Sequence, residues 1–247
     1  MVTFVDLLYV ALFAVVLPLV DHFVFWPPLL RRVQSDPVRA RAWLYAWGIA
    51  APWVLVGVGA ALWWSNDRSW TSLGFLVPDG WRLWVSVVLS LLLVVYIVYA
   101  GAALVRDSQA RASVRQQMTT GLDAISPHTR TELYCFAGVS LTAGFCEEFL
   151  YRGYFIWTMS PWLGWWGAAA LSLLLFASGH AYQGLNGVIR TAIAGALYTL
   201  AVAISGSLWP AIVLHILVDL YGGLIAWLAL REGPATLLRD STEQIAD

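Results

Sequence analysis

The sequence predicts an all-α membrane protein, a bundle of about seven transmembrane helices. Three observations support this class: of 247 residues 60% are hydrophobic, only 12% are charged, and the mean hydropathy is +0.71. These values lie well outside the composition of soluble domains. Long apolar runs recur along the whole chain, and no Gly-rich or Pro-rich linker divides it. We therefore expect one polytopic membrane domain over residues 1–247.

Each predicted helix is a run of apolar residues long enough to cross the ~30 Å hydrocarbon core of a bilayer. Seven such runs are present, so we expect about seven transmembrane helices, within a range of six to eight. The runs lie at about residues 4–26, 42–64, 81–105, 133–157, 162–182, 188–205 and 208–230. A turn at residues 160–164, which contains Pro161 and Gly164, separates the fourth run from the fifth.

Arginine is distributed unevenly among the connections between these runs. The first and third connections are the basic ones: Arg31, Arg32, Arg39 and Arg41, then Arg106, Arg111, Arg115 and Arg130. Because basic loops stay in the cytoplasm, we expect the N-terminus outside and the C-terminal tail inside. All basic residues are arginine, a bias that favours a bacterial origin. We therefore expect a multi-pass protein of the bacterial inner membrane.

The net charge and the two cysteines argue against a nucleic-acid partner, a disulfide and a cysteine zinc site. The net charge is −1 and no basic run is present, so a nucleic acid is not expected as a partner. Cys135 and Cys146 are separated by about 16 Å along one predicted helix, which is too far for a disulfide, and they lack zinc-ligand spacing. The oligomeric state is left open by the sequence.

Two adjacent carboxylates and an arginine interrupt the fourth apolar run. A charged residue at the centre of a membrane helix costs about 2.5–3.5 kcal/mol, so a cluster of them indicates a site. Glu148 and Arg152 are four residues apart and can pair on one helix face. Glu147 is turned away by about 100° and has no basic partner at helical spacing. We therefore expect Glu147 to be the free carboxylate.

Further ionisable residues lie in the fifth and seventh runs. Phe176 is followed by His180, and His215 is followed by Asp219. The turn between the fourth and fifth runs places Glu147 and His180 at similar depth. His215 is expected nearer the outer face, unless the turn at residues 205–207 is sunk into the membrane or a water-filled cavity joins the levels.

Three other ionisable residues fall in the first run. Asp6, Asp21 and His22 lie near its predicted ends, where contact with headgroups is cheap. A functional role is expected for none of them.

The ordered motifs EExxxR, FxxxH and HxxxD resemble those of the CAAX protease and bacteriocin-processing (CPBP or Abi) family of intramembrane proteases. This family is related to the type II CAAX prenyl endopeptidase, and the resemblance covers roughly residues 132–225. It implies hydrolysis of a peptide bond in a membrane-associated peptide or protein, without a cofactor. The candidate catalytic residues are Glu147, Glu148, His180, His215 and Asp219, and the candidate positioning residues are Arg152 and Phe176.

The roles also follow from the resemblance. Glu147 is the expected general base, His180 orients or shares the water, and His215 with Asp219 faces the developing oxyanion. Eukaryotic relatives have Asn where this chain has Asp219. An ionised Asp cannot donate a hydrogen bond, so Asp219 is either protonated or holds His215 in its donating tautomer. We prefer the second role.

Three alternative functions use the same residues. Two histidines and a carboxylate could form the zinc site of a metalloprotease, although no HExxH spacing is present. A transporter or proton channel could use the ionisable groups as a relay, but no inverted repeat is visible. A non-catalytic scaffold of the same family is the third alternative. The bilayer and a peptide or membrane-protein substrate are the partners expected for the protease.

Overall fold

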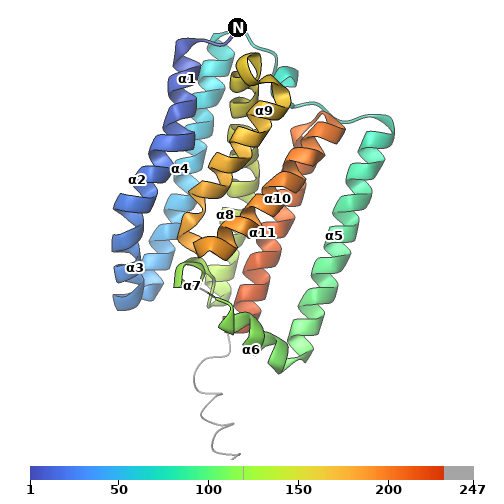
Figure 1. Ribbon diagram of the computed structural model, residues 1–247. Coiled ribbons are helices and arrows are strands. Elements are labelled where there is room, and N and C mark those ends of the chain that lie inside the picture. The colour runs from blue at the N-terminus through green and yellow to red at the C-terminus, as the bar shows by residue number, and fades with distance from the viewer. Residues whose placement is uncertain (119, 231–247) are drawn as a thin grey trace, which may run out of the picture.

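The computed structural model describes residues 1–118 and 120–230, and these residues form a bundle of helices without a strand (Figure 1). Six helices in this part of the chain are long and apolar enough to cross a membrane: Phe4–Ser35, Pro37–Ser65, Gly80–Arg106, Arg130–Gly179, Ala181–Ser205 and Leu208–Leu230. The expected all-α, multi-pass architecture is confirmed. Arg231 and Arg239, which belong to the predicted cytoplasmic tail, lie outside the described residues.

The longest of the six segments contains a hairpin and accounts for two of the predicted crossings. It consists of α8 (Arg130–Glu147), the π-helical segment η4 (Glu148–Phe155) and α9 (Ile156–Gly179). The helical backbone is broken inside α9 at Gly164, where φ is 66° and ψ is 166°. Positive φ is accessible to glycine without a steric penalty. The chain folds back there, in the turn expected at residues 160–164, and the Ser172 hydroxyl donates to the Tyr151 carbonyl at 2.9 Å across the hairpin.

The first membrane segment is one long helix interrupted by two π-helical turns. Its parts are α1 (Phe4–Ala11), η1 (Leu12–Val16), α2 (Leu17–Val20), η2 (Asp21–Phe25) and α3 (Trp26–Ser35). The helix therefore continues beyond residue 26, where the apolar run ends. Asp21 lies about 14 residues before its C-terminal end, or ~21 Å along the axis. The expectation that Asp21 is close to the end of the helix is wrong.

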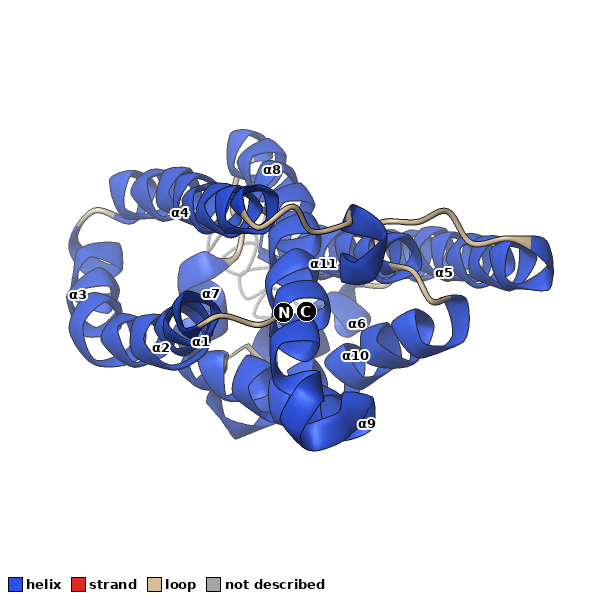
Figure 2. Ribbon diagram, turned by 90° about the horizontal axis from the view of Figure 1, so that it is seen from above, coloured by secondary structure: helices blue, strands red, loops and turns tan. Residues whose placement is uncertain are grey.

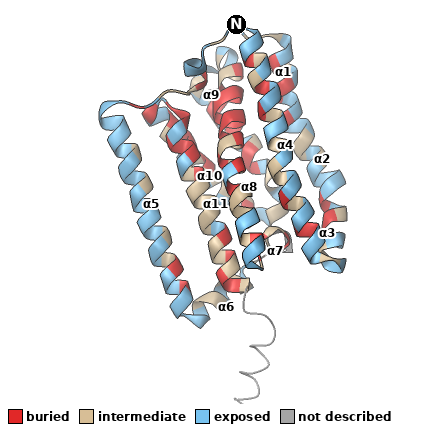
Figure 3. Cartoon of the chain, turned by 180° about the vertical axis from the view of Figure 1, so that it is seen from behind, coloured by how far each residue is buried: buried red, intermediate tan, exposed pale blue. Residues whose placement is uncertain are grey.

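The next helices extend from the first segment to the far edge of the bundle. They are α4 (Pro37–Ser65), a loop with the short helix η3 (Trp70–Leu73), α5 (Gly80–Arg106), α6 (Ser108–Gln116) and α7 (Thr120–Ile125). Figure 2 shows α5 at one edge of the bundle, on the side opposite α3, and Figure 3 shows that its surface is mostly exposed. The basic first and third connections meet at one end of the bundle, where Arg41 Nε donates to Glu132 Oε1 at 2.8 Å.

The opposite end is held together by a buried network around Asp6. This residue was expected near a helix end in contact with headgroups, but only 1% of it is exposed. Arg68 lies in the second connection, residues 66–79 between α4 and α5. It donates from both terminal nitrogens to Asp6, at 2.8 and 2.7 Å. The Tyr154 hydroxyl also donates to Asp6. The N-terminus, the second connection and η4 are thus tied to one carboxylate.

The last two helices complete the core beside α8. The short helix η5 (Ala181–Gln183) precedes α10 (Gly184–Ser205), and α11 (Leu208–Leu230) follows after a tight turn. α11 packs closely against α8 at Gly144, where an added Cβ would lie only 2.9 Å from the Ile216 backbone nitrogen. This close approach places Glu147, at the end of α8, beside His215 on α11.

Candidate active site

η4 begins directly after Glu147, and it carries a buried ion pair. Arg152 Nη1 donates to Glu148 Oε1 at 3.0 Å, and the two side chains are 1% and 0% exposed. Arg152 Nη2 donates to the Gly195 carbonyl of α10 at 3.0 Å. The pair expected from the spacing of four residues is present. π-Helical segments inside helices are often found at functional sites, and here the segment begins at Glu148, directly after Glu147.

His215 is held in place by the same carboxylate. Its Nδ1 lies 2.8 Å from Glu148 Oε1, and because an ionised carboxylate only accepts, Nδ1 donates. The Tyr198 ring stacks on the imidazole, with ring centroids 4.6 Å apart and an interplanar angle of 18°. Tyr198 was not identified from the sequence, because nothing in its local spacing relates it to a histidine 17 positions later.

The other nitrogen of His215 faces two further carboxylates. His215 Nε2 lies 3.8 Å from Glu147 Oε2 and 3.7 Å from Asp219 Oδ2. Both separations are too long for direct hydrogen bonds. The orienting contact expected from Asp219 is therefore made by Glu148, and Asp219 lies on the opposite side of the ring. This arrangement gives Glu148 a positioning role within the candidate catalytic set.

Glu147 differs from Glu148 in both exposure and pairing. Its side chain is 26% exposed, whereas that of Glu148 is fully buried. Glu147 Oε2 has no hydrogen-bond partner among the described residues. The expectation that Glu147 is the free carboxylate agrees with this geometry.

His180 is positioned by the residue four places earlier. The Phe176 carbonyl lies 2.9 Å from His180 Nδ1, so Nδ1 donates and Nε2 is unprotonated in the neutral imidazole. The Phe176 ring lies 4.9 Å from the His180 ring and 6.0 Å from the His215 ring. It also lies 4.2 Å from the Arg152 guanidinium carbon. Phe176 therefore fixes the spacing between the two histidines and covers the ion pair.

The candidate residues meet at a cavity of about 770 Å³. Glu147, His180, His215 and Asp219 all line it, although they come from α8, from the C-terminal end of α9 and from α11. The structure thus brings together every residue that the motifs select for direct contact with a substrate. Glu148 and Arg152 lie behind the cavity wall.

The turn between α10 and α11, which precedes His215 in the chain, is buried in the protein. The second connection covers this turn, with Ser207 Oγ donating to the Leu76 carbonyl at 2.6 Å and the Leu208 amide donating to the Gly74 carbonyl at 2.9 Å. Ser207 and Leu208 are 0% exposed. In Figure 1 the turn lies below the level of the N-terminus. The turn is thus covered by protein, as a turn sunk into the membrane would need to be, and the depth of His215 in the bilayer stays a prediction.

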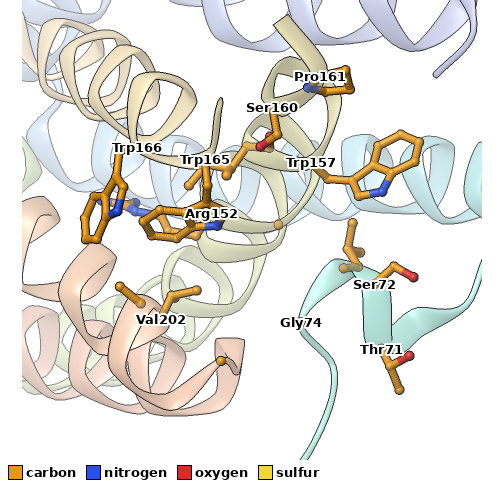
Figure 4. A pocket seen from close by; sticks show the side chains of 15 residues that line it. Thr71, Ser72, Gly74, Arg152, Trp157, Ser160, Pro161, Trp165, Trp166 and Val202 are labelled. Carbon is orange, nitrogen blue, oxygen red and sulfur yellow. The ribbon is translucent and has the colours of Figure 1, made fainter. Parts of the chain in front are cut away.

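A second cavity, of about 800 Å³, lies between the second connection, α9 and α10. Figure 4 shows Trp157 on one side of it and Trp165 with Trp166 on the other. No carboxylate or imidazole lines it, and the terminal nitrogens of Arg152 are bonded to Glu148 and Gly195. We therefore assign the chemistry to the cavity that contains Glu147.

The donor groups around the cavity bear on whether a metal ion could bind there. Within residues 1–118 and 120–230, no three His, Cys, Asp or Glu side chains have an arrangement suited to a metal ion. His215 Nδ1 is already bonded to Glu148, which leaves one nitrogen of this residue for any other ligand. The groups present are suited to proton transfer and hydrogen bonding.

The comparisons with known proteins agree with the motifs. Residues 129–221 match the family model described as type II CAAX prenyl endopeptidase Rce1-like. The matched segment is less than half of the 247 residues, and it contains all three motifs. No curated protein and no solved structure matches the chain. The family resemblance derived from the motifs is confirmed.

Proposed function

We propose that this chain, which carries a type II CAAX prenyl endopeptidase Rce1-like domain, hydrolyses a peptide bond of a membrane-associated peptide or protein within the bilayer. The family implies a protease embedded in the membrane. The observation that carries the mechanism is the division of labour between the two glutamates. Glu148 is fully buried and is bonded through Oε1 to Arg152 and His215, whereas the side chain of Glu147 is 26% exposed and lines the cavity.

In the first step, Glu147 and His180 bind and activate a water molecule. One water proton is directed to a Glu147 oxygen and the other to His180 Nε2, the nitrogen left unprotonated by the bond from Nδ1 to Phe176. The water oxygen then attacks the substrate carbonyl carbon, and its proton passes to Glu147. A positioned general base of this kind typically raises the rate by about 10²–10⁴-fold.

In the second step, His215 stabilises the oxyanion. Its Nδ1 is bonded to Glu148, so Nε2 can donate only from the protonated ring. Glu147, Glu148 and Asp219 each have an oxygen within 3.8 Å of a ring nitrogen, and their charges would stabilise a positive imidazolium. Glu147 then gives its proton to the leaving nitrogen as the C–N bond breaks. The products are a new carboxyl group and a new amine.

The reaction can be tested without knowing the natural substrate. Purified protein in lipid nanodiscs is incubated with a synthetic library of apolar peptides in water enriched in ¹⁸O, and fragments are analysed by mass spectrometry. We expect fragments whose new C-termini contain ¹⁸O. Glu147→Gln should abolish them while preserving the fold, because an amide is nearly isosteric but cannot accept the proton.

The matched control is Asp79→Asn, which removes a carboxylate from an exposed loop position outside the cavity. It should leave the yield of labelled fragments unchanged. Equal yields from the native chain and from Glu147→Gln would contradict the proposal. So would an absence of labelled fragments from the native chain.

A further inference from the structure

The wall of the catalytic cavity extends beyond the Rce1-like domain. Asp21, on η2, lines the cavity together with Glu147, His180 and Asp219. The family model begins at residue 129, so Asp21 belongs to a part of the chain that it does not cover. A residue in this position can distinguish the substrates of this chain from those of other proteins with the same domain.

Asp21 lies on the side of the cavity next to His180. The helix that carries Asp21 lies in contact with the end of α9. A Cβ added at Gly179 would be 3.9 Å from Pro18 Cβ. Asp21 follows Pro18 by three residues, which is about one helical turn. Asp21 and His180 both line the cavity. A substrate residue near Asp21 would therefore lie close to the activated water.

The carboxylate of Asp21 has no hydrogen-bond or ion-pair partner within the described part of the chain. It lies well inside a membrane-spanning helix, where a carboxylate is costly unless a partner or water stabilises it. The other acidic residues on the cavity wall are Glu147 and Asp219, which add negative charge. Arg190 is the arginine on that wall, and no ion pair joins it to Asp21 within the described residues.

We propose that Asp21 is a specificity-determining residue that receives the cationic side chain of a Lys or Arg residue of the substrate, close to the scissile bond. This inference rests on the proposed function, because it places the cation in the cavity that contains the catalytic water. A charge pair of this kind discriminates against neutral and acidic residues at the same position, since these leave the carboxylate without a cation.

The experiment compares three apolar nonapeptides of alternating Leu and Ala, with Lys, Gln or Glu at the central position. Binding is measured on chains that carry Glu147→Gln, so that no peptide is consumed, and cleavage on chains that retain Glu147. We expect the Lys peptide to bind about ten times more tightly than the Gln peptide, or about 1.4 kcal/mol. Asp21→Asn should make the two affinities equal, whereas Asp21→Glu should keep the preference for Lys.

Asp79→Asn serves as the control and should keep the full preference for Lys. Equal binding of the Lys and Gln peptides to the chain with Asp21, including no binding of either, would overturn the inference. A preference for Lys that survives Asp21→Asn would overturn it too. Tight binding of the Lys peptide without cleavage by the chain with Glu147 would instead count against the proposed hydrolysis and leave the role of Asp21 intact.

Discussion

Removing the charge of Arg152 should destabilise the protein far more than removing the whole ion pair. In the variant Arg152→Met, the Glu148 carboxylate stays 0% exposed and loses the hydrogen bond of 3.0 Å. Leaving one member of a buried pair without its partner typically costs about 3–5 kcal/mol. The Gly195 carbonyl also loses its bond from Arg152, which adds about 1 kcal/mol. The expected total is about 4–6 kcal/mol.

The double variant Glu148→Gln with Arg152→Met should recover much of this loss. It contains no uncompensated charge, and the Gln carbonyl oxygen can still accept the bond from His215 Nδ1. The remaining costs are the bond to Gly195 and the weaker neutral bond to His215, together about 2 kcal/mol. The double variant should therefore be more stable than the single variant by about 2–4 kcal/mol.

Thermal unfolding in detergent, followed by circular dichroism, measures this difference. At roughly 2–4 °C per kcal/mol for a chain of this size, the single variant should unfold about 10–20 °C below the native protein. The control is Arg39→Met, because Arg39 lies 3.6 Å from Asp36 with 91% of its side chain exposed, and it should behave as the native chain does. Equal midpoints for the single and double variants would refute the reasoning.

Four further predictions concern topology, packing and mechanism. Reporter fusions at Asp247 and within residues 106–130 should both be cytoplasmic, and a periplasmic signal from either would reverse the proposed orientation. Gly144→Ala should lower cleavage more than Gly57→Ala, because only the first places a Cβ against the α11 backbone; similar losses would argue against close packing as the cause. His215→Ala should lower kcat by a factor of about 10²–10³. Asp219→Asn should retain most turnover, since His215 is oriented by Glu148. A larger loss from Asp219→Asn than from His215→Ala would assign the orienting role to Asp219. Chelators should leave cleavage unchanged. The glutamate mechanism would be replaced by that of a metalloprotease if chelation stopped cleavage, added zinc restored it, and zinc retention depended on Glu147, His180 and His215.

The membrane segments could be predicted from the sequence because their signal is local. An apolar run of sufficient length forms a helix wherever it lies in the fold, since the bilayer leaves its backbone no other hydrogen-bond partner. The hairpin at Gly164 was also predicted from a local signal, because Pro161 restricts the backbone and Gly164 allows the positive φ of a turn. The ion pair of Glu148 and Arg152 was predicted from a spacing of four residues within one helix.

The features that the sequence missed are contacts between distant segments. The bond between Glu148 and His215 joins residues 67 positions apart, and the stacking of Tyr198 on His215 joins two helices. The second connection covers the turn between α10 and α11, which precedes His215 in the chain. No periodicity within one helix encodes such contacts. The continuation of the first helix past residue 26 was missed because Pro27 and Pro28 end the apolar run, although the helix continues to Ser35.

The shared oxygen of Glu148 supports the different roles that we propose for the two adjacent glutamates. Arg152 and His215 both donate to Glu148 Oε1, so one carboxylate neutralises the buried cation and also orients the imidazole. Its burial makes it unavailable to a substrate. Glu147, one residue earlier, has no cation within hydrogen-bond distance in the described chain, and its side chain reaches the cavity. The group best placed to bond it is a water molecule, and a carboxylate that binds water in an apolar cavity is suited to act as a general base.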